Sequence, residues 1–255
     1  MRIVQISDLH FGMHNPYLIE PFLSDLAALE PDLILISGDL TQRAKEEQYI
    51  LMQQFLERIA LPFLAVPGNH DIPFFNPFKR LLQPFKHYHR YISQNLDSQF
   101  SNDEVNILGV NSVDRFKIKD GQLSQSTLER IKDHFSSNSS QLNILFFHHN
   151  LNYFSGLHHP LNNAEEFIEY LKDSPIHLVC TGHLHYANVK IISKTPAQQF
   201  ALLHAGSLLC ARSKDKQNSF FVIDIDKLKC KIDLRVFEGQ KFNSQQGYEL
   251  DFGDK

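Results

Sequence analysis

Five short apolar stretches, each followed directly by polar residues, constrain this 255-residue chain more than any other feature. In chain order they read IVQIS, LILIS, FLAVP, ILFF and HLVCT. Such runs, bounded by Gly or Pro, predict strands buried on both faces, as in parallel sheets. Helical spacing in 16–29 and 44–59 separates the first three, which predicts right-handed crossovers and an α/β fold. Ligands bind such sheets at the carboxyl ends of the strands, so the polar residues are expected to meet there.

The polar residues at these strand ends are Asp, Asn and His, the donors of a metal centre. The candidate metal ligands are Asp8, His10, Asp39, Asn69, His148, His183 and His185. Carboxylate, amide and imidazole groups suit divalent Mn, Fe or Zn, whereas a structural zinc site would favour Cys. A single such residue would more often cap a helix or satisfy a turn. Seven in this order favour two ions that share a carboxylate, which is the arrangement that cleaves phosphate esters.

The spacing within two of these blocks also has a physical reason. In segments 8–10 and 183–185, residues two apart on extended chain point the same way, so both can face one pocket. The glycines at 38, 68 and 182 directly precede candidate ligands. They are expected to allow sharp exits from the sheet and close backbone approach.

The ordered blocks D-x-H, G-D, G-N-H-D, H and G-H-x-H, spread over residues 3–186, resemble the calcineurin-like metallophosphoesterase superfamily. The resemblance implies a four-layer α-β-β-α sandwich of two mixed sheets flanked by helices. It also implies hydrolysis by a hydroxide that bridges two metal ions. The implied ligand sets are Asp8, His10 and His185 for one ion and Asn69, His148 and His183 for the other, with Asp39 bridging. The fourth block departs from the family pattern, since Asn150 follows the His pair where many phosphodiesterases have Pro.

Two residues of the G-N-H-D block are predicted to take part in catalysis without binding metal. By the family pattern, His70 protonates the leaving oxygen or stabilises developing charge. Asp71 is predicted to orient His70. A turn or helix-capping role for Asp71 is the equal alternative.

Substrate recognition is predicted to need polar groups beyond the metals. Arg43 follows the Gly-Asp block, and a guanidinium binds phosphate in a bidentate manner. The further candidates for substrate binding are Asn111, His149 and Arg212. The remaining histidines are interpreted as surface or packing residues, except that for His204 a functional role is an equal alternative.

The chain most resembles bacterial members related to cyclic-nucleotide phosphodiesterases, which favours a nucleotide-type phosphodiester as the substrate. Two other activities stay open: a pyrophosphatase acting on a nucleotide-linked lipid A precursor, and a phosphomonoesterase. A non-catalytic scaffold with the same fold is the alternative from another class, and the intact ligand set argues against it.

Residues 72–100 are predicted to form a helical cap or lid over the site. Prolines interrupt 72–95, which predicts a broken helix pair with Phe78, Leu81, Phe85, Tyr88 and Ile92 facing inward. Lys79, Lys86 and Arg90 form either a solvated basic face or a basic rim for an anionic substrate. With the nearby phenylalanines, they could contact a membrane.

The remaining sequence predicts one domain over 1–240, with 187–240 as strands of the second sheet and 241–255 as a polar, loosely held tail. The net charge of -4 argues against nucleic acid as a partner. Three dispersed cysteines, without a signal-peptide pattern, predict a reducing, cytoplasmic location. A homodimer is an open prediction from the resemblance.

Overall fold

The computed structural model describes residues 1–136, 141–195, 198–211 and 217–253. Two six-stranded sheets form its centre, in the orders β12-β11-β10-β1-β2-β3 and β4-β5-β6-β7-β9-β8. The strands of the first sheet are β1 (Arg2–Ile6), β2 (Leu33–Ile36), β3 (Phe63–Ala65), β10 (Ser219–Asp226), β11 (Lys229–Glu238) and β12 (Lys241–Asp251). Those of the second are β4 (Ser98–Ser101), β5 (Val105–Gly109), β6 (Leu142–Phe146), β7 (Leu178–Thr181), β8 (Asn188–Ser193) and β9 (Gln199–His204).

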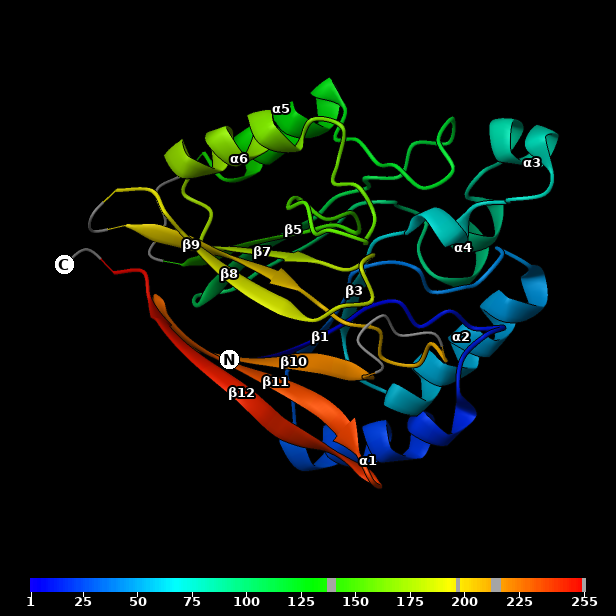
Figure 1. Cartoon of the computed structure of the whole chain (residues 1–255), viewed down its shortest axis with the longest axis horizontal. Helices are drawn as coiled ribbons and strands as arrows, with labels where there is room; N and C mark the ends of the chain where they lie inside the picture. The colour runs from blue at the N-terminus through cyan, green and yellow to red at the C-terminus, as the bar shows by residue number, and fades with distance from the viewer. Residues whose placement is uncertain (137–140, 196–197, 212–216, 254–255) are drawn as a thin grey trace.

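Helices cover the outer face of each sheet, which confirms the four-layer sandwich (Figure 1). They are α1 (Ile19–Leu29), α2 (Glu46–Ile59), α3 (Pro77–Leu82), α4 (Lys86–Tyr91), α5 (Gln125–His134) and α6 (Ala164–Asp173), with 3₁₀ turns η1 (Pro16–Leu18) and η2 (Asn69–Asp71). Three apolar clusters fill the three interfaces between layers. Because successive strand residues point to opposite faces, Ile3 of β1 packs between the sheets and Val4 packs with α1 and α2.

The prediction that 187–240 are strands of the second sheet is wrong for β10 and β11, which belong to the first sheet. Strands β8 and β9 extend the second sheet beside β7, while β10, β11 and β12 extend the first sheet beside β1. The tail predicted to be loosely held is the 11-residue strand β12, so that prediction is wrong. Antiparallel pairing with β11 accounts for the order of this polar segment, and burial of Phe242 and Leu250 anchors it.

Parallel pairing brings the polar strand ends to one edge. Strands β1, β2 and β3 run parallel in the first sheet, and β5, β6, β7 and β9 run parallel in the second. The loops after β1, β2, β3, β6 and β7 therefore converge at the carboxyl edges of the two packed sheets.

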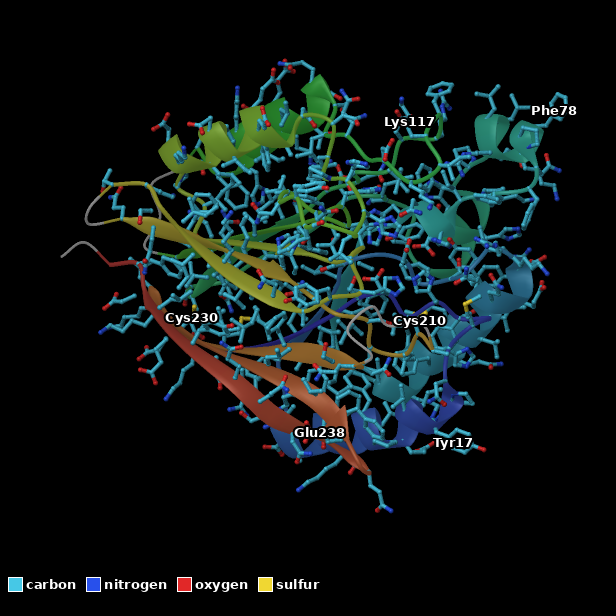
Figure 2. The ribbon with its side chains drawn as sticks, viewed as in Figure 1. Tyr17, Phe78, Lys117, Cys210, Cys230 and Glu238 are labelled. Carbon is cyan, nitrogen blue, oxygen red and sulfur yellow. The ribbon has the colours of Figure 1, made fainter. Side chains whose placement is uncertain are left out.

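The segment that follows η2 divides into two unlike helices. In α4, Tyr88 is buried and its hydroxyl donates to the Ala65 carbonyl oxygen at 3.1 Å. In α3, Phe78 is 77% exposed and Leu81 is 46% exposed, so the expected inward packing of these two residues is wrong. Figure 2 shows Phe78 at the outer end of the molecule. A hydrophobic residue at helical spacing packs inward only where a neighbouring element covers it. In the described ranges, no helix has the length and apolar character needed to span a bilayer.

Candidate metal centre

The backbone turns sharply at the candidate ligands. Asp8, His10, Asp39, His183 and His185 all have positive φ, between 49° and 72°. Non-glycine residues rarely adopt this left-handed conformation, and strained positions gather at functional sites. The side chains of 8–10 and 183–185 therefore converge through left-handed turns, and the extended-chain reason predicted for their spacing is wrong.

Glycine is required beside the ligands because the strand ends approach one another closely. A Cβ atom on Gly68 would lie 2.2 Å from Asp39 Oδ1, and one on Gly182 would lie 1.9 Å from Ser7 Oγ. Any larger residue would push these loops apart.

One group of ligand atoms, which we call the Asp8 cluster, comprises Asp8, His10, Asp39 and His185. One donor atom from each residue lies within 4.8 Å of the others. His10 Nε2 is 2.9 Å from His185 Nε2 and 3.5 Å from Asp39 Oδ2. Asp8 Oδ1 lies 3.2 Å from His185 Nε2, while Asp8 Oδ2 accepts the His183 backbone N–H at 2.9 Å. The hydrogen bond fixes Asp8 Oδ2, and Asp8 Oδ1 faces the cluster.

The second group, the His148 cluster, comprises Asn69, Asp39, His148 and His183. His148 Nε2 lies 3.2 Å from Asn69 Oδ1, 3.2 Å from His183 Nδ1 and 3.4 Å from Asp39 Oδ1. His148 Nδ1 lies 2.8 Å from the Ser37 carbonyl oxygen, which can only accept a hydrogen bond. Nδ1 must therefore carry the proton, which leaves the lone pair of the neutral ring on Nε2, directed at the cluster.

Asp39 belongs to both groups. Its Oδ2 faces His10 in the Asp8 cluster, and its Oδ1 faces His148 in the other cluster. The structure thus brings together all seven residues predicted to bind metal, and it divides them as the resemblance implied.

Electrostatics at the two clusters favour cations. Burial opposes the charge on His148, but Asp39, Asp8 and the Ser37 carbonyl oxygen together outweigh it and raise the pKa to about 9. Burial alone would raise the pKa of Asp8, but His185 and His10 hold it well below its usual range. In the absence of metal, a proton on the imidazole therefore supplies positive charge beside the buried carboxylates.

The donor set fits divalent cations by a second criterion. Asp8 Oδ1, which faces the Asp8 cluster, is buried without a hydrogen-bond partner. Buried polar atoms are usually satisfied, and unsatisfied ones gather where an ion or water is missing. The convergent nitrogens of His10 and His185 also cannot both carry protons at 2.9 Å.

His70 lies beside the Asp8 cluster, with its ring centroid 4.9 Å from that of His10. Its Nδ1 lies 2.8 Å from the Gln42 carbonyl oxygen, which fixes the proton on Nδ1 and leaves Nε2 as the exchangeable position. The orienting contact comes from Gln42, a backbone partner that no sequence signal specified.

Asp71 makes the contacts of a residue that stabilises turns, which is the alternative to a role in catalysis. Its carboxylate is buried and accepts the backbone N–H groups of Leu40 at 3.1 Å, Thr41 at 2.8 Å and Gly68 at 2.9 Å. No described contact joins it to the His70 ring. Burial and the nearby Asp39 raise the pKa of Asp71 to about 6, although the three amides lower it. Asp71 therefore ties the ends of β2 and β3 together.

The three described residues of the four predicted to bind substrate have different locations. Arg43 Nη1 lies 3.4 Å from His70 Nδ1, so the guanidinium is at the site. His149 is buried against His183, with ring centroids 4.8 Å apart, and burial and His148 lower its pKa to about 3. Asn111 instead lines a cavity of about 750 Å³ whose described walls contain none of the candidate ligands. Arg212 lies outside the described residues.

Comparisons with known proteins agree with this geometry. The sequence model of the calcineurin-like phosphoesterase family matches residues 1–187. The chain belongs to this family. A probable cyclic nucleotide phosphodiesterase of Vesicomyosocius okutanii is 29% identical over 210 residues, which are 75% of this chain and 84% of that protein. A probable glycerophosphodiester phosphodiesterase, GpdQ, of Arcobacter nitrofigilis is 26% identical over 76% of this chain and 72% of that protein.

The fold has counterparts among solved structures. A dimetal phosphatase from Danio rerio superimposes with a TM-score of 0.72 at 9% identity, over 99% of each chain. Family membership confirms the prediction of a metal-dependent phosphoric ester hydrolase that acts on a small phosphate ester.

Proposed function

We propose that the chain is a phosphodiesterase that uses two divalent ions, Mn or Fe, one at each cluster. The observation that carries this proposal is Asp39, whose two oxygens face His10 and His148 separately, at 3.5 and 3.4 Å. When bound, such an ion pair supplies a hydroxide-like nucleophile near neutral pH and neutralises charge on the phosphate oxygens.

The protein groups position the reaction. Asp8, His10 and His185 would hold one ion, and Asn69, His148 and His183 the other, on either side of Asp39. His148 donates to the Ser37 carbonyl oxygen, and Asp8 accepts from the His183 amide. These two hydrogen bonds fix both ligands and keep their lone pairs directed inward without reorganisation.

His70 is proposed as the general acid. With Nδ1 fixed on the Gln42 carbonyl oxygen, a proton on Nε2 can pass to the leaving oxygen of the ester. No protein side chain then has to attack phosphorus.

A nucleotide-type diester is the proposed substrate. The Arg43 guanidinium lies beside His70 and also 4.9 Å from the centre of the Phe74 ring and 5.5 Å from that of Phe75. A cation and an exposed aromatic pair at adjacent positions suit a phosphate joined to a flat, partly apolar group such as a nucleobase. The relatives named as probable cyclic nucleotide phosphodiesterases support the same class.

The test uses metal-depleted protein reconstituted with Mn. Rates with bis-p-nitrophenyl phosphate and p-nitrophenyl phosphate are compared, and then rates with 3′,5′-cyclic nucleotides. Preference for the diester, with turnover of a cyclic nucleotide, is the expected result. Preference for the monoester would instead indicate a phosphatase at the same site.

A second candidate, a nucleotide-linked lipid, is favoured by the apolar surface next to Arg43. Phe75 and Phe78 are each 77% exposed, and Leu82 is 75% exposed. Figure 2 shows Phe78 and the cation Lys117 on neighbouring projections of the same end of the molecule. Such a surface could contact the acyl chains of a substrate in an anionic membrane. Faster hydrolysis of an acylated nucleotide diphosphate than of a cyclic nucleotide would establish this candidate. A homodimer and a cytoplasmic location stay predictions.

A further inference from the structure

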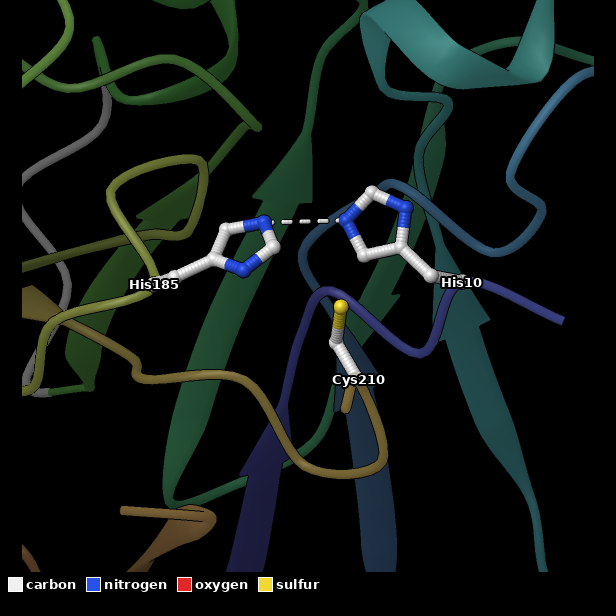
Figure 3. A group of neighbouring side chains, drawn as sticks. All are labelled: His10, His185 and Cys210. Carbon is white, nitrogen blue, oxygen red and sulfur yellow. Dashed lines mark hydrogen bonds between the residues drawn. The ribbon is translucent and has the colours of Figure 1, made fainter. Parts of the chain in front are cut away.

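Cys210 lies next to the Asp8 cluster, although no strand-end motif contains it. Its Sγ and one ring nitrogen each of His10 and His185 all lie within 4.8 Å of one another. Figure 3 shows the sulfur directed at the gap between the two imidazoles. Cys210 is buried, with 2% exposure, and forms no disulfide.

The loop that carries Cys210 is bonded to the loop that carries Asp8 and His10. Backbone bonds join Leu208 N to Ser7 O at 3.0 Å and Asn15 N to Leu209 O at 2.8 Å. Ser207 Oγ donates to the Asp8 carbonyl oxygen at 2.7 Å and accepts from Cys210 N at 2.9 Å. These bonds hold the backbone at Cys210 in a defined position relative to Asp8 and His10.

A second observation points to a cation at this place. Asp8 Oδ1 is fully buried, has no hydrogen-bond partner and lies 3.2 Å from His185 Nε2. The sulfur groups with the two imidazoles but not with the carboxylates. It therefore lies on the imidazole side of the cluster.

The other two cysteines lack this setting. Cys180 and Cys230 are buried in the apolar cluster between the sheets, and burial raises the pKa of the Cys230 thiol to about 12. They are matched internal controls, with the same side chain and similar burial but no neighbouring ligand.

We propose that Cys210 is an additional ligand, through its thiolate, of the ion held by Asp8, His10 and His185. This inference rests on the proposed metal centre. On binding, the sulfur donates an electron pair to the cation and the thiol proton leaves to solvent, with no change of oxidation state. Because thiolates favour softer ions, this cluster should prefer Zn²⁺ or Fe²⁺, whereas the His148 cluster, with nitrogen and oxygen donors only, should accept Mn²⁺ equally well.

The test is a Co²⁺ titration of the metal-depleted protein, followed by absorption under anaerobic conditions. Visible d–d bands report ions at the centre, and a near-ultraviolet sulfur-to-cobalt charge-transfer band reports thiolate ligation. The wild type is expected to show both. Cys210→Ser should lose the charge-transfer band, keep visible bands and bind Zn²⁺ at least about tenfold more weakly. Cys180→Ser and Cys230→Ser should keep both bands.

The other outcomes distinguish failure of Cys210 ligation from failure of the metal centre. Visible bands without a charge-transfer band in the wild type, or a charge-transfer band that survives in Cys210→Ser, would overturn the Cys210 inference and leave the centre intact. No cobalt bands at all would overturn the metal centre itself. Should Cys210→Ser not fold, X-ray absorption at the zinc edge of the wild type decides the point. A sulfur neighbour supports the inference, and a shell of nitrogen and oxygen alone contradicts it.

Discussion

The Asp8 and His148 clusters share one carboxylate but differ in charge and enclosure. The Asp8 cluster has a second carboxylate, a neighbouring thiol and, in His185, a side chain that is 15% exposed. The His148 cluster has an amide in place of that carboxylate, and its two histidines are buried to 4% exposure or less. In the proposed centre, we therefore expect the Asp8 cluster, which carries more negative charge, to hold its ion more tightly than the His148 cluster.

The largest effect is expected from Asp39→Asn, which removes the only charge the two clusters share. The amide oxygen can still accept the His70 backbone N–H that Asp39 Oδ1 accepts at 2.9 Å, so the fold should persist. Hydrolysis should fall by at least about 10³-fold, because the ions supply several kcal/mol of transition-state stabilisation. Asp224→Asn, which alters an exposed pair with Arg2, is the matched control and should keep full activity.

Variants that remove a ligand from one cluster should show how the two metal positions differ. His10→Ala should leave one ion at the His148 cluster, and His148→Ala should leave one at the Asp8 cluster. We expect hydrolysis to fall by roughly 10²-fold or more in each. Of the two retained ions, the one beside Asp8 should resist a chelator longer. Equal resistance in the two variants would contradict the role given to charge.

His70→Gln should slow catalysis without loss of either ion. A general acid contributes about 10²–10⁴-fold, and the loss should shrink as the leaving group becomes more acidic. Rates with a series of substituted phenyl diesters measure this dependence. A uniform loss across the series would assign His70 to charge stabilisation instead.

Asp71→Asn should affect stability more than chemistry. The amide nitrogen that replaces one oxygen cannot accept the amide protons of Leu40 or Gly68, which costs about 1–3 kcal/mol for each buried group left unpaired. Chemical unfolding of the variant should show this loss, with turnover per folded, metal-loaded molecule close to wild type. A large loss of turnover at full metal occupancy would restore a catalytic role.

The smallest effect concerns pH in the metal-depleted protein. The pKa of His148 is raised from 6.5 to about 9, so its stabilisation is fully present below pH 6.5 and disappears as the pH rises through 9. Burial lowers the pKa of His177, remote from both clusters, to about 4, so its contribution is present above pH 6.5 and lost as the pH falls towards 4. Asp39→Asn should reduce the alkaline loss, and His177→Gln the acid loss, in melting temperatures measured between pH 4 and 9.

The ligand-bearing strands were predictable because each combines an apolar run with an ordered polar block. Local pattern suffices there, because a strand buried on both faces reads as a near-continuous apolar run. The left-handed turns at Asp8 and His183 were not predictable, because spacing alone does not distinguish them from extended chain.

Features that depend on contacts between distant parts of the chain could not be predicted from the sequence either. Strand β12 is polar, and its order comes from pairing with β11. Phe78 follows helical spacing, yet no described element covers it. The place of Cys210 depends on hydrogen bonds between the loops after β1 and β9, which lie about two hundred residues apart in sequence.

In the proposed centre, Asp39 lies between two ions. Anomalous diffraction from crystals of the Mn²⁺-reconstituted protein tests it most directly. We predict two peaks, one among Asp8, His10 and His185 and the other among Asn69, His148 and His183, each within bonding distance of a different Asp39 oxygen. A single peak in fully loaded crystals, or two peaks of which either is not bound to Asp39, would contradict the account.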